Sequence, residues 1–165
     1  MSEVADLRRM ILRELQTFKQ EVQLFPDSAM LWTTLPGVTN SAGNLALHAA
    51  GNLRHFVGAV LGKTGYVRNR DAEFKSRDLD RVTVLAELDA AIAEVGATFE
   101  RLDPAALALP YPQPVGGITV TTGRFLIHLA VHLGFHLGQA GYLRRMATGQ
   151  NTSAGPVAVT ALAEP

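Results

Sequence analysis

The stretch TGRFLIHLAVHLGFHLGQAGYLRRM, residues 122–146, decides the fold of this chain and carries its most informative motif. Its apolar residues recur every three or four positions, which is the spacing of one face of an α-helix. His132 and His136 lie four residues apart in it, so a helix places both imidazoles on one face, one above the other. Two imidazoles in this arrangement can each give one nitrogen to a single metal ion. A third ligand must then come from elsewhere in the chain.

Three further segments show the same helical period. The first covers residues 3–25. The second covers residues 41–61 and has Asn40 or Ser41 as its N-cap, and the third covers residues 80–102. Four amphipathic helices without a convincing strand pattern predict an all-α fold, a four-helix bundle. The connections are long, so crossovers are expected, and successive helices are allowed to be parallel neighbours.

The composition limits the class of protein. A chain of 165 residues, 47% of them hydrophobic, is long enough for one globular domain, which we place at residues 1–148, with an extended or disordered tail at residues 149–165. The 15 basic and 15 acidic residues balance, so we expect no nucleic-acid partner, because such proteins carry a basic surplus. No apolar run is long enough to span a bilayer, and the N-terminus lacks the features of a signal peptide. We therefore expect no membrane association and a cytoplasmic location.

The histidines are the candidate metal ligands, because the chain has no cysteine. His48 and His55 lie in the second predicted helix, about 10 Å apart along its axis at a rise of ~1.5 Å per residue. His128 and His136 lie about 12 Å apart in the fourth. Neither pair can share one ion at zinc–nitrogen distances of ~2.0–2.1 Å. The spacing therefore predicts His132, one of its two neighbours on the same helix, and one histidine of the second helix. It leaves the choice and the relative helix direction open.

The alternative is that these histidines are structural. A histidine pair at this spacing often occurs without a metal, and the motif lacks the glutamate of an HExxH zinc-protease helix. However, His48, His132 and His136 all fall on the apolar stripes of their helices, where an unpaired imidazole is costly to bury. Three core-facing histidines in one small bundle are hard to explain without a shared partner, which favours a metal site over a purely structural role.

Glycines inside the helices and a basic loop after the second helix are two further features of the sequence. Glycines inside the helices, such as Gly51, Gly134 and Gly138, are interpreted as sites of close packing, within the bundle or at a dimer interface. A basic loop, residues 63–70, follows the second helix. We interpret it as a solvated loop; the alternative is that Arg68 and its neighbours recognise an anionic group of a substrate near the metal.

Two blocks of the sequence are similar to a known family. The segment LALHAAGNLRHF, residues 45–56, resembles the second-helix block of the DinB-like superfamily of small helical metalloproteins, with His48 as its histidine. The segment LIHLAVHLGFHLGQA, residues 126–140, resembles the HxxxHxGQ block of the family's last helix. The four-helix layout extends the resemblance over nearly the whole chain. Leu137 departs from the pattern, because many relatives have arginine directly after the second histidine.

The resemblance implies a bundle with a long crossover, in which the ligand-bearing second and fourth helices are antiparallel. It selects His48, His132 and His136 as the metal ligands and leaves His55 and His128 as a second polar layer. It also implies a divalent ion, often zinc or nickel, and a homodimer. Related branches use low-molecular-weight thiols as cosubstrates in sulfur transfer.

These features lead us to expect a divalent-metal-dependent enzyme of the thiol-dependent S-transferase type, acting on a small-molecule substrate. Three neutral imidazoles leave the charge of the ion intact and a coordination position open for water or a thiolate. A hydrolase that uses the same site is the nearest alternative. Two others are a non-enzymatic metal-binding stress-response protein, in which the ion orders the bundle, and a protein whose histidines bind no physiological metal.

Overall fold

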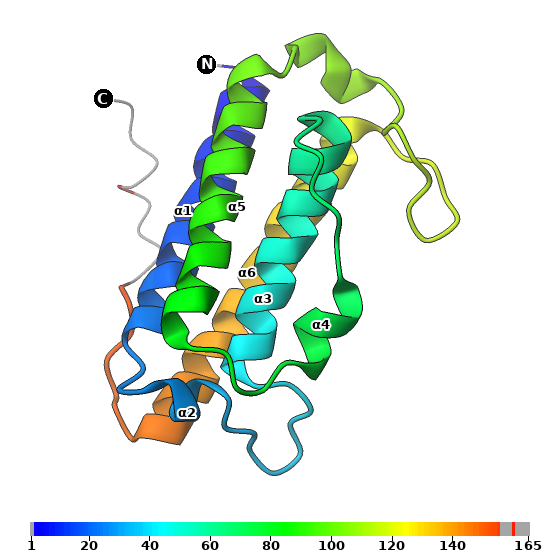
Figure 1. Ribbon diagram of the computed structural model, residues 1–165. Coiled ribbons are helices and arrows are strands. Elements are labelled where there is room, and N and C mark those ends of the chain that lie inside the picture. Colours follow the sequence, from blue (N-terminus) through cyan, green and yellow to red (C-terminus); the bar gives the residue numbers. More distant parts are fainter. Residues whose placement is uncertain (1, 156–159, 161–165) are drawn as a thin grey trace.

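Four long helices form the expected all-α bundle in the computed structural model, which describes residues 2–155 and 160 (Figure 1). They are α1 (Glu3–Gln23), α3 (Ala42–Leu53) with its π-helical continuation η1 (Arg54–Leu61), α5 (Arg81–Arg101) and α6 (Thr122–Thr148). Their ends lie close to the predicted ones. Short helices that the sequence pattern did not predict lie in the connections: α2 (Ser28–Leu31), α4 (Arg70–Lys75) and the 3-10 helix η2 (Pro104–Ala108).

The long helices pack as two parallel pairs. α1 and α3 each pack on both α5 and α6, so α1 and α3 lie diagonally opposite each other. Figure 1 shows α3 and α5 running in one direction and α1 and α6 in the other. The expected antiparallel arrangement of the histidine-bearing helices, α3 and α6, is thus confirmed. The connection of residues 62–80 returns along the bundle as the expected long crossover, with α4 packed against α3.

Polar caps and a glycine set the ends of the two helices that carry the histidines. At the start of α3, the hydroxyl of Ser41 accepts a hydrogen bond from the backbone N–H of Asn44, and the Asn44 side chain accepts one from the N–H of Ser41. This capping box satisfies two amides that the helix leaves without partners. Thr121 caps α6 in a similar way, and Gly149 ends it with a φ of 70°, a conformation that favours glycine.

The core is continuous between the long helices, and α3 is its most enclosed part. All 12 residues of α3 are buried. The fully buried apolar side chains come from each long helix and include Ile11, Leu15, Phe18, Leu53, Leu88, Leu126, Leu129 and Leu133. Despite this apolar content, no helix within the described ranges is long and apolar enough to cross a membrane.

The chain that follows α6 is held against the bundle for its first few residues. Arg144, which is fully buried, pairs with Glu21 of α1 and donates a hydrogen bond to the carbonyl of Thr152. The other oxygen of Glu21 accepts a hydrogen bond of 3.0 Å from the N–H of Ala154. Residues 156–159 and 161–165 of the predicted tail lie outside the described residues. The division into a domain of residues 1–148 and an extended or disordered tail of residues 149–165 therefore stays a prediction.

Candidate metal centre

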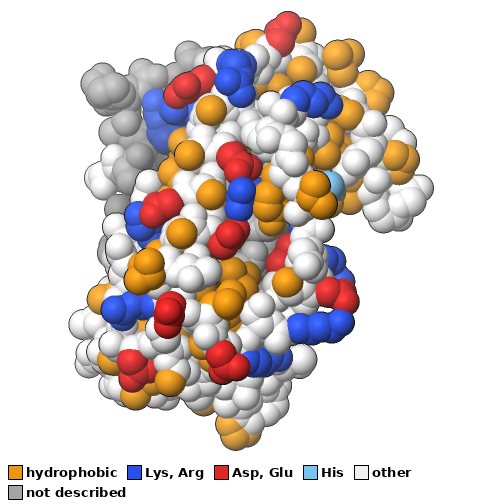
Figure 2. Space-filling view, in the orientation of Figure 1, with side chains coloured by type: hydrophobic (Ala, Val, Ile, Leu, Met, Phe, Trp, Pro, Cys, Tyr) orange, Lys and Arg blue, Asp and Glu red, His pale blue; other side chains and the backbone are white. Residues whose placement is uncertain are grey.

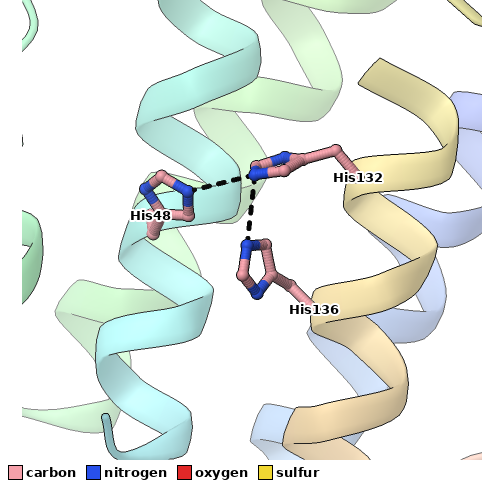
Figure 3. Close-up of side chains that lie close together, drawn as sticks. All are labelled: His48, His132 and His136. Carbon is pink, nitrogen blue, oxygen red and sulfur yellow. Dashed lines mark hydrogen bonds between the residues drawn. The ribbon is translucent and has the colours of Figure 1, made fainter. Parts of the chain in front are cut away.

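Three histidines from α3 and α6 meet between the two helices (Figure 3). The Nε2 atom of His132 lies 3.4 Å from Nε2 of His48 and 3.1 Å from Nε2 of His136. Each residue offers one ligand atom, and these atoms all lie within 4.8 Å of one another. The structure thus brings together the three residues that the sequence nominated. Their role as metal ligands stays a prediction.

The two histidines of α6 lie at the edge of the core face and not within it. His48 is buried, with 6% of its surface exposed, whereas His132 and His136 are half-buried. The centre of the core face of α6 is occupied by leucines such as Leu133 and Leu137. The expectation that all three histidines face the core is therefore wrong for the pair on α6, because apolar side chains take the inner positions. One side of the cluster consequently opens toward solvent.

Glu73 of α4 fixes the ring of His48. Its Oε2 lies 2.9 Å from Nδ1 of His48, and its two oxygens accept hydrogen bonds of 2.6 and 2.8 Å from Arg68. Burial raises the pKa of Glu73, but the hydrogen bonds from Arg68 and His48 outweigh it and hold this pKa below its usual value. The carboxylate is therefore ionised and accepts the Nδ1 proton of His48. Nη2 of Arg68, which can only donate, lies farther from the same nitrogen, at 3.2 Å, and directs its hydrogen bond to Glu73. The lone pair of His48 is then on Nε2, the atom that faces the other two histidines.

Gln139 orients His136 in a similar way. Its Oε1 lies 2.8 Å from Nδ1 of His136, which places the proton on Nδ1 and the lone pair on Nε2. Burial and repulsion from the neighbouring imidazoles lower the pKa of His132 to about 4. Burial also lowers the pKa of His136, although the hydrogen bond to Gln139 opposes it. His132 and His136 are therefore neutral near pH 7, which is the state that binds metal ions.

The three Nε2 atoms cannot all be satisfied by hydrogen bonds to one another. His48 and His136 each direct a lone pair at Nε2 of His132, and that nitrogen carries at most one proton. One acceptor therefore faces another acceptor at short distance. A cation bound by three unprotonated Nε2 atoms removes this conflict, and neutral imidazoles suit divalent transition metals. The donor set thus fits a divalent ion held by one residue of α3 and two of α6.

Sequence reasoning missed the contacts of Glu73 and misjudged Arg68. The basic loop of residues 63–70 was interpreted as solvated, but the side chain of Arg68 is only 12% exposed and lies inside the site. Its partner Glu73 belongs to a short helix that was not predicted. The one signal in the sequence was Gly51, because a Cβ atom there would lie 2.3 Å from Oε1 of Glu73. A glycine inside a buried helix can indicate that another side chain approaches the backbone closely.

The expected second layer of His55 and His128 is not formed. Among the described residues, no hydrogen bond or ring contact joins these two side chains. His55 lies 3.4 Å from the Gln113 amide, whereas the ring of His128 stacks between those of Phe125 and His132. The physical reason is η1, because a π-helix has wider turns than an α-helix. Every side chain after Arg54 is therefore rotated away from the position that α-helical spacing predicts.

Comparison with known proteins agrees with this fold. The sequence matches the model of the DinB superfamily over residues 10–140. A solved structure of similar fold is that of a conserved protein from Enterococcus faecalis, with a TM-score of 0.73, 16% sequence identity and coverage of 91% of this chain and 99% of that one. At this identity the likeness shows the fold alone. No curated protein matches the sequence. Because the family match covers most of the chain, this protein belongs to the DinB superfamily.

Proposed function

We propose that this protein is a divalent-metal-dependent enzyme that joins a low-molecular-weight thiol to a small electrophilic substrate. Membership of the DinB superfamily and the histidine cluster fit a metal-dependent protein. The proposal depends most on the convergence of three Nε2 atoms on a point that is buried on the α3 side and open on the α6 side. Zinc or nickel is the ion that we propose.

The proposed chemistry needs a thiolate next to an electrophile. A divalent ion at this site would lower the pKa of a thiol that approaches its open side. The sulfur then forms a bond to the electrophilic carbon, the leaving group departs with its electron pair, and the thiol proton passes to solvent. The chain's own contribution is orientation, because Glu73 fixes His48 and Gln139 fixes His136. The cosubstrate supplies the sulfur, which is consistent with a chain that has no cysteine.

The hydrogen bonds of Glu73, the carboxylate beside the histidines, favour thiol transfer over hydrolysis. Metal-dependent hydrolases of the HExxH type use a carboxylate as general base for the attacking water. Within the described residues, Glu73 is the carboxylate in contact with the histidines, and Arg68 and His48 occupy both of its oxygens. It is therefore poorly suited to accept a proton from water. A thiol needs a general base less, because its pKa is far below that of water.

Metal content and a paired activity assay test this proposal. Protein purified without an affinity tag should contain about one equivalent of a transition metal, or take it up from added zinc or nickel. The metal-loaded protein is then given monochlorobimane with glutathione, coenzyme A or cysteine, and separately para-nitrophenyl acetate. Thioether formation without ester hydrolysis supports the proposal, whereas ester hydrolysis alone favours the hydrolase. Metal binding with neither activity favours a non-enzymatic metal-binding protein, and a protein that retains no metal contradicts the site.

We also propose that the protein forms a homodimer through the outer face of α6. Three large apolar side chains, Val131, Phe135 and Tyr142, are between 62% and 68% exposed there. A Cβ atom at Gly134 or Gly138 would meet no atom of the described residues within 4 Å, so packing among the described helices does not explain these two glycines. Exposed apolar stripes of this kind are typical of protein interfaces. Sedimentation equilibrium should give a dimer, and Val131→Asp should give a folded monomer; a monomeric wild-type protein contradicts this.

A further inference from the structure

A hairpin-like loop forms a pocket over the first turns of α6. The segment of residues 110–121 is closed by two isolated bridges, Pro110 with Thr121 and Val115 with Ile118, and it projects from the bundle (Figures 1 and 2). Below it lies a cavity of about 320 Å³. The lining is mostly apolar and includes Val115, Ile118, Val120, Phe125, Arg124 and His128.

The aromatic wall of this pocket is held in place from behind. Phe125 is 4% exposed, and its ring centre lies 4.5 Å from that of Tyr111 and 5.1 Å from that of Phe56. The hydroxyl of Tyr111 donates a hydrogen bond of 2.7 Å to the backbone carbonyl of Phe56. These contacts fix the wall before any ligand arrives, so the cost of ordering it on binding is small.

A row of rings connects the pocket with the candidate metal centre. The ring of His128 stacks on that of Phe125 at 6.0 Å with an interplanar angle of 12°. On its other side it stacks on His132 at 6.0 Å and 27°. The three residues follow one face of α6, and His128 and His132 are separated by about one helical turn of ~5.4 Å. His128, which lines the pocket, is thus in ring contact with His132 of the candidate metal centre.

The pocket also has a cation and an apolar rim. Arg124 lines it and makes no ion pair within the described part of the chain. Ile118, at the tip of the loop, is 63% exposed, although a large apolar side chain in a loop gains nothing from contact with water. Figure 2 shows a histidine side chain at the surface beside this projecting loop. The lining thus combines an apolar wall with one positive charge that has no ion-pair partner among the described residues.

We propose that this pocket binds the apolar part of the electrophilic substrate, with an acidic group of that substrate paired to Arg124. The substrate class is therefore a small carboxylic acid whose aromatic or branched aliphatic group is joined to its reactive carbon by a short spacer, because the ring of His128 lies between His132 and the wall of the pocket. This inference rests on the proposed function, because it places the reactive carbon at the three histidines. The pocket nevertheless has its own contacts and can be tested without turnover.

The first experiment uses the protein loaded with cobalt, whose visible spectrum reports ligands that bind the ion. The probes are imidazole, N-benzylimidazole and the para-carboxylate of N-benzylimidazole. We expect the benzyl group to increase affinity about tenfold through burial of its ring, and the carboxylate to increase it further through Arg124. Equal affinity for imidazole and N-benzylimidazole would overturn the proposal.

Two variants with matched controls locate the effect. Ile118→Ser should remove most of the benzyl preference and leave imidazole binding unchanged, whereas Val82→Ser, at a 75% exposed position on α5, should change neither. Arg124→Gln should remove only the gain from the carboxylate, and Arg101→Gln should not. Ile118 is exposed, and the Arg124 side chain makes no ion pair with any described residue, so neither change threatens folding. A benzyl preference that persists in Ile118→Ser contradicts the pocket.

A metal-free measurement separates this inference from the proposed function. In the protein without metal, methyl NMR signals of Val115, Ile118 and Val120 should shift on addition of phenylacetate, and Arg124→Gln should weaken this binding. If cobalt does not bind but these signals still shift, the proposed function fails and the pocket stands. If cobalt binds imidazole but phenylacetate leaves these signals unchanged, the metal site stands and the pocket is contradicted.

Discussion

The α3 side and the α6 side of the candidate metal centre are built on different principles. His48 lies in a helix that is buried throughout, and its ring is held by Glu73, which Arg68 holds in turn. His132 and His136 lie at the border between the core face and the open face of α6, and the exposed Gln139 orients one of them. The α3 side is thus a rigid anchor for the ion, and the α6 side is open to solvent. A site needs both, because a rigid ligand sets geometry while an open side admits substrate.

Removal of the His48 side chain should have the largest effect on zinc affinity. We expect His48→Ala to lower zinc affinity by more than about a hundredfold, since loss of a ligand costs more than loss of an orienting group, which costs about 10- to 100-fold. Competition titration against a chelator measures this. His55→Ala, which removes a histidine from the next turns of the same helical run, should leave the affinity unchanged. Equal losses in the two variants would contradict the assignment of His48.

Substitutions of Glu73 and Gln139, which orient His48 and His136, should lower zinc affinity to different extents. Glu73→Gln should lower zinc affinity by about 10- to 100-fold, because Nδ1 of His48 loses an ionised, buried acceptor. Gln139→Ala should cost less, because water can replace an exposed amide at Nδ1 of His136. The same titration applies. If Gln139→Ala has the larger effect, the anchor lies on α6 and the comparison is reversed.

Two glycine-to-alanine changes should have opposite effects on the free energy of unfolding. Alanine at position 51 would place its Cβ 2.3 Å from an oxygen of Glu73 that Arg68 holds, so Gly51→Ala should destabilise the fold by about 1–3 kcal/mol and weaken metal binding. A Cβ at position 134 meets no described atom of the same chain within 4 Å, so Gly134→Ala should stabilise the helix by up to about 1 kcal/mol when it is introduced into the monomeric Val131→Asp protein. Urea unfolding measures both. A stabilised Gly51→Ala protein would show that the Glu73 contact is not rigid.

The stability of the metal-free protein should also depend on pH. In the metal-free protein, the pKa of His132 is lowered from 6.5 to about 4, so the unfolded chain takes up a proton at this residue before the folded chain does. The stability that the neutral ring contributes is therefore complete above pH 6.5 and is lost as pH falls toward 4. His132→Gln should flatten the fall in the free energy of unfolding over this range. An unchanged slope in His132→Gln would contradict the shift.

The long helices and the three histidines were predictable because both follow from short-range rules. A period near 3.6 residues, with caps such as Ser41 and Gly149, located the helices to within a few residues. The i, i+4 spacing paired His132 with His128 or His136 and required one histidine of the second helix. The family resemblance then selected His136 and His48. The position of His132 and His136 at the edge of the core face was not predictable in the same way. The apolar stripe of α6 includes both histidines and several leucines, and the leucines occupy its buried centre.

The contacts of Glu73 and the position of His55 depend on structure that local patterns do not carry. α4 has six residues, too few to show an amphipathic period, although Asn69 does provide its N-cap. Glu73 reaches His48 only because the crossover returns along α3. The π-helix from Arg54 gives no signal in apolar spacing, so the predicted alignment of His55 could not include it.

The crossover also sets the order in which the centre can be completed. His48 and Glu73 are 25 residues apart in the chain, whereas His48 and His132 are 84 apart. Closing the longer loop costs more entropy, so we expect the anchored half to form from a local segment and the other half to wait for the last helix. A chain still emerging from the ribosome has no α6 and lacks two of the three nitrogens. Tight retention of the ion would therefore mark a finished molecule and distinguish it from an incomplete one.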